Sequence, residues 1–172
     1  IAYSHQYGVN TAIEDSTGAI WFTQSTENRD GDRLFEALQK PMSDGALYRL
    51  PPRSEDHGVV AELILDGLNF ANGFYLDENE SKLYLSETMA HQVLTFDLNV
   101  ESGSISNRKV LGYVPTPDNM RIYHDGSLWV ASPLSNQIFS LDLRHGNSKV
   151  VFDAQTSTGA RLVEIGMKEG VA

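Results

Sequence analysis

Three segments of the chain repeat one order of residue types, and this repeat limits the fold more than any other feature. Each segment opens with Asn, continues as a short apolar strand, passes an acidic turn and reaches an aromatic residue in a second strand. The Asn and aromatic residues pair as Asn10 with Trp21, Asn72 with Tyr84, and Asn119 with Trp129, at separations of 11, 12 and 10 positions. Similar units at a regular period are typical of repeat folds, in which each unit packs against the next.

Two more strands follow in every unit. Apolar or alternating runs predict third strands at 46–50, 93–97 and 138–142, and fourth strands at 59–64, 109–113 and 149–152. The repeated Asn residues lie 62 and 47 positions apart, a period that fits four-stranded propeller blades. We therefore predict an all-β fold, a partial β-propeller of about three four-stranded antiparallel blades. The predicted single domain is 1–172, with blades at 9–66, 67–114 and 115–153 and the start of a further blade at 160–172.

A propeller closes as a ring of roughly 4–8 blades. Three blades leave two open apolar faces, so we expect self-association through these faces. The first unit is longer than the second because of an insertion at about 28–43, which either covers the mouth of the ring or only decorates it. The best helical pattern in the chain, at 32–38, lies in this insertion and is ended by Pro41.

The composition limits which classes of partner and which chemistry the chain can use. The formal net charge is -10 and the sequence pI is about 4.8, which disfavours nucleic acid as a partner and is compatible with binding a cation. There is no cysteine, so disulfides, thiolate metal sites and a Cys nucleophile are excluded. We see no membrane span and no signal peptide. The sequence does not select a compartment.

Polar residues open the innermost strand of each unit. In a propeller these strand starts meet at one end of the central channel, so we expect the side chains of Asn10, Asn72, Asp118 and Asn119 to converge. Amide and carboxylate oxygens are the ligands of Ca²⁺, a hard cation that takes 6–8 oxygens. Zinc is disfavoured because Cys and paired His ligands are missing. The alternative is structural, because Asn and Asp at strand starts often bond to the backbone of turns.

Five short motifs resemble the paraoxonase family, and gluconolactonases and strictosidine-synthase-like proteins share weaker versions. The motifs are FANGF (70–74), LYLSE (83–87), AHQV (90–93), PDNM (117–120) and GSLWV (126–130). The resemblance extends over 9–152. It implies a six-bladed propeller with calcium at the channel mouth and calcium-dependent hydrolysis of lactones or aryl esters. It also implies that Asn10, Asn72, Asp118 and Asn119 are calcium ligands and that Asp118 is the general base. The family's glutamate ligand and its catalytic His pair correspond to positions before Ile1.

Two departures from the family limit this expectation. The residue after the first Asn is Thr11, where paraoxonases usually carry an Asp that helps bind a second, structural calcium, so we expect no second ion. The segment 23–26 lacks the family's acidic residue and His, so we expect no catalytic role there. A metal-independent, strictosidine-synthase-like enzyme that joins an amine to an aldehyde is one alternative, which the retained oxygen ligands disfavour. A non-catalytic binding propeller is another.

The remaining conspicuous residues receive structural interpretations. We expect His91 and Glu87 to form buried hydrogen bonds and His124 to lie in a surface turn, whereas His5 is a candidate to line the channel. The repeated aromatic residues, Trp21, Tyr84 and Trp129, are expected to pack between blades. No Gly-X-Ser-X-Gly nucleophile motif is present, so acyl-serine chemistry is not indicated.

Overall fold

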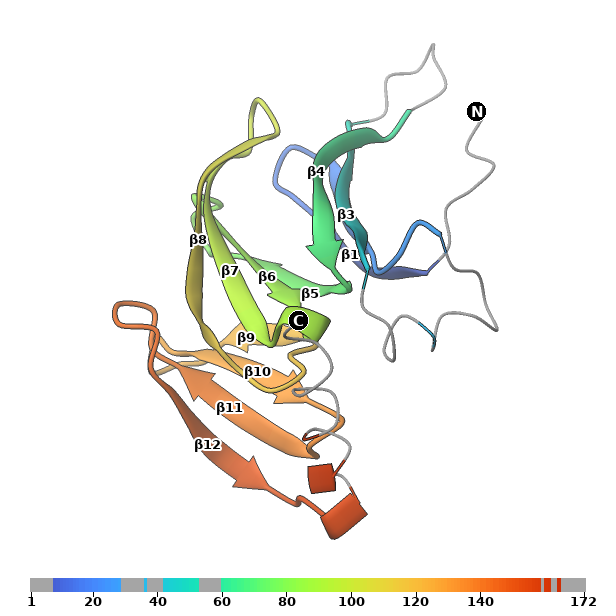
Figure 1. Ribbon diagram of the computed structural model, residues 1–172. Coiled ribbons are helices and arrows are strands. Elements are labelled where there is room, and N and C mark those ends of the chain that lie inside the picture. The colour runs from blue at the N-terminus through green and yellow to red at the C-terminus, as the bar shows by residue number, and fades with distance from the viewer. Residues whose placement is uncertain are drawn as a thin grey trace.

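Three four-stranded antiparallel sheets make up the described part of the chain in a computed structural model (Figure 1). The structure describes residues 8–28, 36, 42–52, 60–158, 160–161 and 164. Within each sheet the strands follow chain order, from an innermost first strand to an outermost fourth strand. This arrangement confirms the predicted fold class, an all-β partial propeller.

The described residues form twelve strands, and those in the third and fourth places of each sheet overlap their predicted ranges. The first sheet contains β1 (Val9–Glu14), β2 (Ile20–Gln24), β3 (Ser43–Leu50) and β4 (Glu62–Asn69). The second contains β5 (Ala71–Leu76), β6 (Lys82–Glu87), β7 (Gln92–Asn99) and β8 (Ser104–Tyr113), with a short 3₁₀ helix η2 (Thr88–Ala90) before β7. The third contains β9 (Met120–Ile122), β10 (Leu128–Ser132), β11 (Gln137–Leu141) and β12 (Ser148–Asp153).

The acidic turns of the repeat have a shared local cause. After the innermost strand of each sheet, an aspartate carboxylate accepts a backbone N–H two to four residues later. Asp15 accepts from Thr17 at 2.9 Å and Asp125 accepts from Ser127 at 2.9 Å, while Asp77 accepts from the N–H of Ser81. These Asx-type bonds satisfy backbone donors that a tight turn leaves unpaired, which explains why the repeat needs an acidic residue there.

The fourth strand of the first sheet differs from its prediction. It was expected at 59–64, but β4 continues to Asn69 through Asp66 and Gly67, a pair that is typical of a turn. Gly67 has a φ of +70°, and the β3–β4 register shifts three times. The pair therefore forms a bulge within a longer strand. Val59 lies outside the described residues.

Apolar side chains between neighbouring sheets form the core. The largest cluster joins the first two sheets around Trp21, and a second joins the last two around Tyr84. Both side chains are buried, which confirms their predicted packing role. Trp129 lies on the opposite face of the third sheet from Leu128, which points toward the second sheet. There it stacks on Tyr123 with ring centroids 4.0 Å apart.

Several predictions fall wholly or partly outside the described residues. His5 and most of the 28–43 insertion lie there, although Glu36 is described and helical. Of the predicted further blade, only residues 160, 161 and 164 are described, and all three are helical. Among the described residues, no helix is long and apolar enough to cross a membrane.

Candidate functional site

The starts of the innermost strands lie side by side at one end of the three sheets. A Cβ atom added to Gly73 in β5 would lie 2.5 Å from Asn119 Cα and 2.6 Å from Asp118 O. Only glycine allows the two strands to approach so closely. The Thr23 hydroxyl joins the starts of β1 and β5, because it accepts the Thr11 N–H at 3.3 Å and donates to Asn72 O at 2.7 Å.

Strand register shows which residues are equivalent in the repeat. The aromatic Tyr84 pairs with Tyr75, three positions after Asn72, and Trp129 pairs with Arg121, three positions after Asp118. Trp21 likewise pairs with a residue three positions after Asn10. Asp118 is therefore the counterpart of the two asparagines, and Asn119 is the counterpart of Thr11 and Gly73. This refines the sequence repeat, in which the third unit is counted from Asn119.

The same interblade contact recurs at this position. Thr23 donates to the carbonyl of Asn72, and Ser86 donates to the carbonyl of Asp118 at 2.8 Å. Each donor stands two positions after the aromatic residue of its own sheet. In this way the second strand of one sheet holds the backbone of the polar residue that opens the next sheet. The polar residues are also at or next to bulges in β1 and β5, which change the direction of side chains locally.

Two of the predicted ligands share one hydroxyl. Thr11 Oγ1 lies 3.3 Å from Asn10 Oδ1 and 3.1 Å from Asn119 Oδ1. A hydroxyl has a single hydrogen, so it can donate to only one of these amide oxygens at a time. The structure thus brings the amides of the first and third sheets within reach of a common partner, although Asn10 and Asn119 are both exposed.

Asn72 has the most informative environment of the four. Its side chain is 6% exposed, and its Nδ2 donates to Thr88 Oγ1 at 3.0 Å. Its Oδ1 is buried and has no hydrogen-bond partner among the described residues. An unsatisfied buried acceptor costs roughly 1–3 kcal/mol, so this oxygen is suited to meet a ligand.

Asp118 is the single carboxylate of the group. Burial raises the pKa of Asp118, and the hydrogen bond from the Asn119 backbone N–H offsets only part of this increase. The described residues contain no cluster of three or more His, Cys, Asp or Glu side chains that could hold a metal. The four predicted ligands are a different kind of set, because three of them are amides.

The sequence matches the family model described as SMP-30/Gluconolactonase/LRE-like region over residues 3–158. The chain belongs to this family. The predicted resemblance to the superfamily that includes gluconolactonases is therefore confirmed.

Individual relatives agree with this family. Strictosidine synthase-like protein 13 of Arabidopsis thaliana is 33% identical over 115 residues, covering 66% of this chain and 27% of that protein. Regucalcin of Danio rerio is 31% identical over 113 residues, covering 63% of this chain and 37% of that protein. A solved gluconolactonase of Xanthomonas campestris has a TM-score of 0.63 at 23% identity. The match covers 91% of this chain and 50% of that protein. The chain thus spans less than half of the two curated relatives, and the structural likeness shows a shared fold.

The other candidate residues of this gluconolactonase-family chain have structural partners. Glu87 is 0% exposed and accepts hydrogen bonds from Asn69, Gln92 and Arg108, as its buried interpretation predicts. His91 is buried, and its Nδ1 accepts the Thr116 backbone N–H at 3.0 Å. His124 is exposed in the β9–β10 turn, as predicted.

Sequence reasoning missed the hydroxyl residues that support the site, namely Thr23, Ser86 and Thr88. A signal for them was available, because they stand two or four positions after a repeated aromatic residue. Their hydroxyls contact the site residues rather than solvent, and all three are buried. A Ser or Thr in a strand is too common to be noticed without the contacts.

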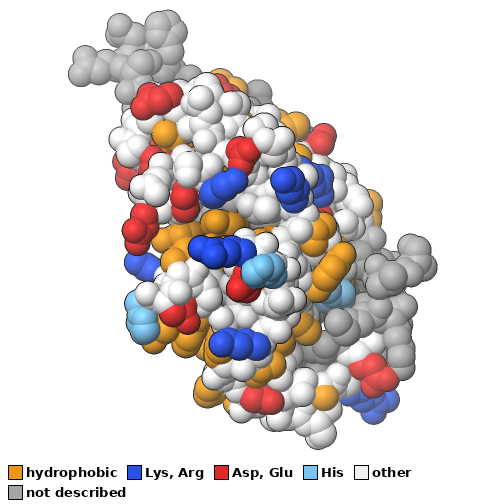
Figure 2. All heavy atoms as spheres, turned by 90° about the vertical axis from the view of Figure 1, so that its left-hand side faces the viewer, with side chains coloured by type: hydrophobic (Ala, Val, Ile, Leu, Met, Phe, Trp, Pro, Cys, Tyr) orange, Lys and Arg blue, Asp and Glu red, His pale blue; other side chains and the backbone are white. Residues whose placement is uncertain are grey.

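Other surfaces of the chain offer weaker sites. A hollow of about 700 Å³ lies between the turns of the third sheet around Asp125 and Asp142, at the ends of the strands remote from Asp118. Both carboxylates already accept hydrogen bonds from their own turns. Lys and Arg side chains are interspersed with Asp and Glu on the face shown in Figure 2, and no continuous basic surface is seen among the described residues of that face.

Proposed function

We propose that this chain contributes a calcium site to a hydrolase that acts on lactones or esters. The ligands would be Asn10, Asn72, Asp118 and Asn119, which lie at the starts of three neighbouring blades. The observation that carries the proposal is the buried Oδ1 of Asn72, which lacks a hydrogen-bond partner among the described residues. Membership of the SMP-30/gluconolactonase family supports the lactonase activity.

The donor set fits the ion. Ca²⁺ takes 6–8 oxygen ligands, including neutral amide oxygens and carboxylates. The four residues offer three amide oxygens and one carboxylate, so further oxygens must come from water, from substrate or from other parts of the protein. The solved relative from Agrobacterium tumefaciens with a TM-score of 0.61 is described as a calcium-binding protein, regucalcin. At 14% identity it shows only the fold, and calcium remains our proposal for this chain.

The proposed site would supply two parts of the reaction. Bound calcium would supply a Lewis acid that polarises the carbonyl group of the substrate. A water oxygen attacks the carbonyl carbon, the carbon–oxygen bond to the leaving oxygen breaks, and one proton passes from the water to that oxygen. Asp118, or a base from another part of the protein, would carry this proton; coordination to calcium would lower the basicity of Asp118. The Asn119 backbone N–H holds the carboxylate in place.

Calcium binding tests the site directly. Asn72→Ala should abolish tight calcium binding measured by isothermal titration calorimetry. Asn99→Ala is the matched control, because Asn99 is exposed and bonds only within the turn after β7. Unchanged calcium affinity in Asn72→Ala would count decisively against the site.

Activity assays separate the proposed function from its rivals. Lactones and aryl esters should be hydrolysed only without a chelator. Condensation of an amine with an aldehyde that persists with chelator would favour the strictosidine-synthase-like alternative. Absence of both activities, together with absence of calcium binding, would indicate a binding propeller.

A further inference from the structure

The Thr88 hydroxyl links Asn72 of the candidate site to Pro117, the residue before Asp118. The hydrogen bonds run in one direction, from Asn72 to Thr88 and from Thr88 to Pro117. The Thr88 hydroxyl donates to Pro117 O at 2.8 Å and lies 3.0 Å from Asn72 Nδ2. A carbonyl oxygen can only accept, so the single hydroxyl hydrogen of Thr88 must be used on Pro117. The Thr88 oxygen is then an acceptor toward Asn72. Of the two ends of the Asn72 amide, only the NH₂ group can donate to it.

This direction determines the orientation of the Asn72 amide. With the NH₂ group turned to Thr88, the Oδ1 atom must face the other way, where it is buried without a partner among the described residues. If the amide were rotated by 180°, two acceptors would face each other at Thr88 and an NH₂ group would face the site. An NH₂ group cannot bind a cation.

The repeat contains an internal comparison that supports this role. The position four residues after the repeated aromatic is Thr88 in the second sheet and Ser25 in the first. Ser25 Oγ lies 3.3 Å from Asn10 Nδ2, so a hydroxyl at this position contacts the equivalent amide. In the third sheet that position is Pro133, and the residue to be oriented is the carboxylate of Asp118. A carboxylate has two equivalent oxygens and needs no such orientation.

We propose that the Thr88 hydroxyl is a positioning residue that turns the Asn72 amide oxygen toward the cation. This inference rests on the proposed calcium site. Thr88 acts through Asn72, because its hydroxyl hydrogen is used on Pro117 and its oxygen accepts from the Asn72 amide. The arrangement makes the site selective for a positive ligand before any ion binds.

Two substitutions at position 88 and one elsewhere test the proposal. Thr88→Val removes the hydroxyl and keeps the shape, whereas Thr88→Ser keeps the hydroxyl. Thr116→Val is the matched control, because Thr116 is also buried and its hydroxyl contacts Ser132 instead of Asn72. Calcium affinity of the full chain, measured by calorimetry, should fall about 10-fold or more in Thr88→Val, as is typical when a residue that orients a metal ligand is lost. It should stay within about 3-fold in the other two variants.

A second measurement does not depend on the metal. In chelator, NMR should show slow hydrogen exchange of the Asn72 side-chain NH₂ group in the parent protein, in Thr88→Ser and in Thr116→Val, but fast exchange in Thr88→Val. Unchanged exchange and calcium affinity in Thr88→Val would overturn the proposal while leaving the calcium site intact. If the parent protein bound no calcium, the proposed function would fail and the exchange measurement alone would decide whether Thr88 orients the amide.

Discussion

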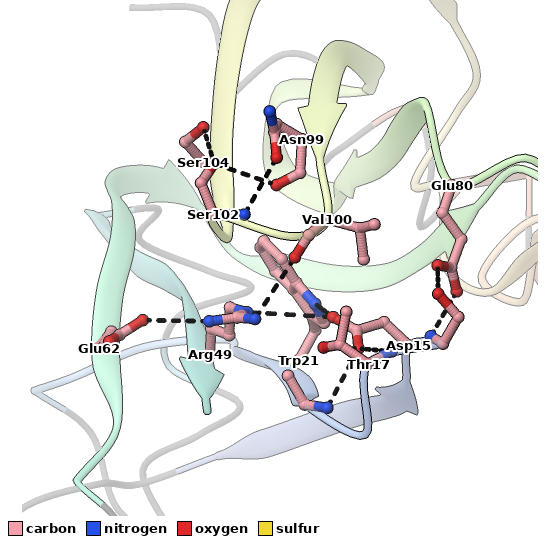
Figure 3. A network of polar contacts seen from close by, with 12 residues as sticks. Asp15, Thr17, Trp21, Arg49, Glu62, Glu80, Asn99, Val100, Ser102 and Ser104 are labelled. Atoms are coloured by element: carbon pink, nitrogen blue, oxygen red, sulfur yellow. Dashed lines mark hydrogen bonds and ion pairs between the residues drawn. The ribbon is translucent and has the colours of Figure 1, made fainter. Parts of the chain in front are cut away.

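Two aspartates at opposite ends of the innermost strands have opposite environments. Asp15, which follows β1, is buried, with Oδ1 accepting from Thr17 and Ala19, and Oδ2 accepting from Trp21 Nε1 at 2.8 Å (Figure 3). Asp118, before β9, is half-buried; burial raises its pKa, and a hydrogen bond from the Asn119 backbone N–H lowers it in part. Burial raises the pKa of Asp15, but its hydrogen bonds more than reverse this, so its pKa lies below the ordinary value.

Arg49 completes the environment of Asp15. Its guanidinium lies over the Trp21 ring, 5.7 Å from the centroid, and its Nε is 3.9 Å from Asp15 Oδ2. Arg49 also reaches Val100 O in the second sheet at 3.4 Å, so this network ties two blades together. A carboxylate whose lone pairs are occupied serves the fold, and one that is buried with few donors is available to a ligand. The comparison teaches that the number of donors, more than burial, decides the direction of the pKa shift in these two aspartates.

The largest expected effect concerns stability. Asp15→Asn should lower the free energy of unfolding by roughly 3 kcal/mol, because it leaves the buried Arg49 with only the exposed Glu62 as a charge partner and removes one acceptor oxygen from the donors around Asp15. Asp118→Asn should leave stability unchanged or increase it, since a partly buried charge is removed. Urea denaturation followed by tryptophan fluorescence measures both. Equal losses in the two variants would remove the distinction between the aspartates.

Calcium affinity should show the reverse order. Asp118→Asn should weaken calcium binding on the order of 100-fold, because it removes the single negative charge among the four proposed ligands. Asp15→Asn should leave the affinity of the folded protein unchanged, as its carboxylate is committed to Thr17, Ala19 and Trp21. Calorimetry at a temperature where both variants are folded provides the measurement. A large loss of affinity in Asp15→Asn alone would show that the wrong aspartate has been assigned to the site.

Acid unfolding sharpens the comparison further. A carboxylate whose folded pKa is depressed adds stability above its unfolded pKa, and this contribution is lost as pH falls through the folded pKa. Asp15 should therefore steepen the loss of stability below about pH 4. Asp15→Asn should flatten that part of the stability curve, measured by urea denaturation at a series of pH values. A curve parallel to that of the parent protein would contradict the lowered pKa of Asp15.

The smallest effect is expected at Thr11. Thr11→Val removes the hydroxyl between the amide oxygens of Asn10 and Asn119. Because these amides are exposed, the free energy of unfolding should change by less than about 0.5 kcal/mol. Calcium affinity should change by less than about 3-fold, since water can replace the hydroxyl. A larger loss of affinity would make Thr11 a ligand and reopen the question of a second ion.

Much of the fold could be predicted because its causes are local. Strand positions follow from the alternation of apolar residues, and the acidic turns follow from Asx-type bonds such as that of Asp77. The main error, in β4, arose because Asp66-Gly67 has the composition of a turn and the conformation of a bulge. Pairing with β3 over the whole strand decided between them, and that pairing involves residues distant in the sequence.

The sequence by itself determined the repeat, the number of strands and the identity of the polar residues that open each blade, since a residue type and its spacing can be read from the chain. Only the tertiary structure decided that Asp118, and not Asn119, is equivalent to Asn72, and that Thr88 bonds to that asparagine. It also showed that Asp15 accepts several hydrogen bonds, whereas Asp118 has few donors. The physical reason is that the register of paired strands and contacts such as that of Thr88 with Pro117 join segments distant in the sequence, and no local pattern specifies how the blades pack together.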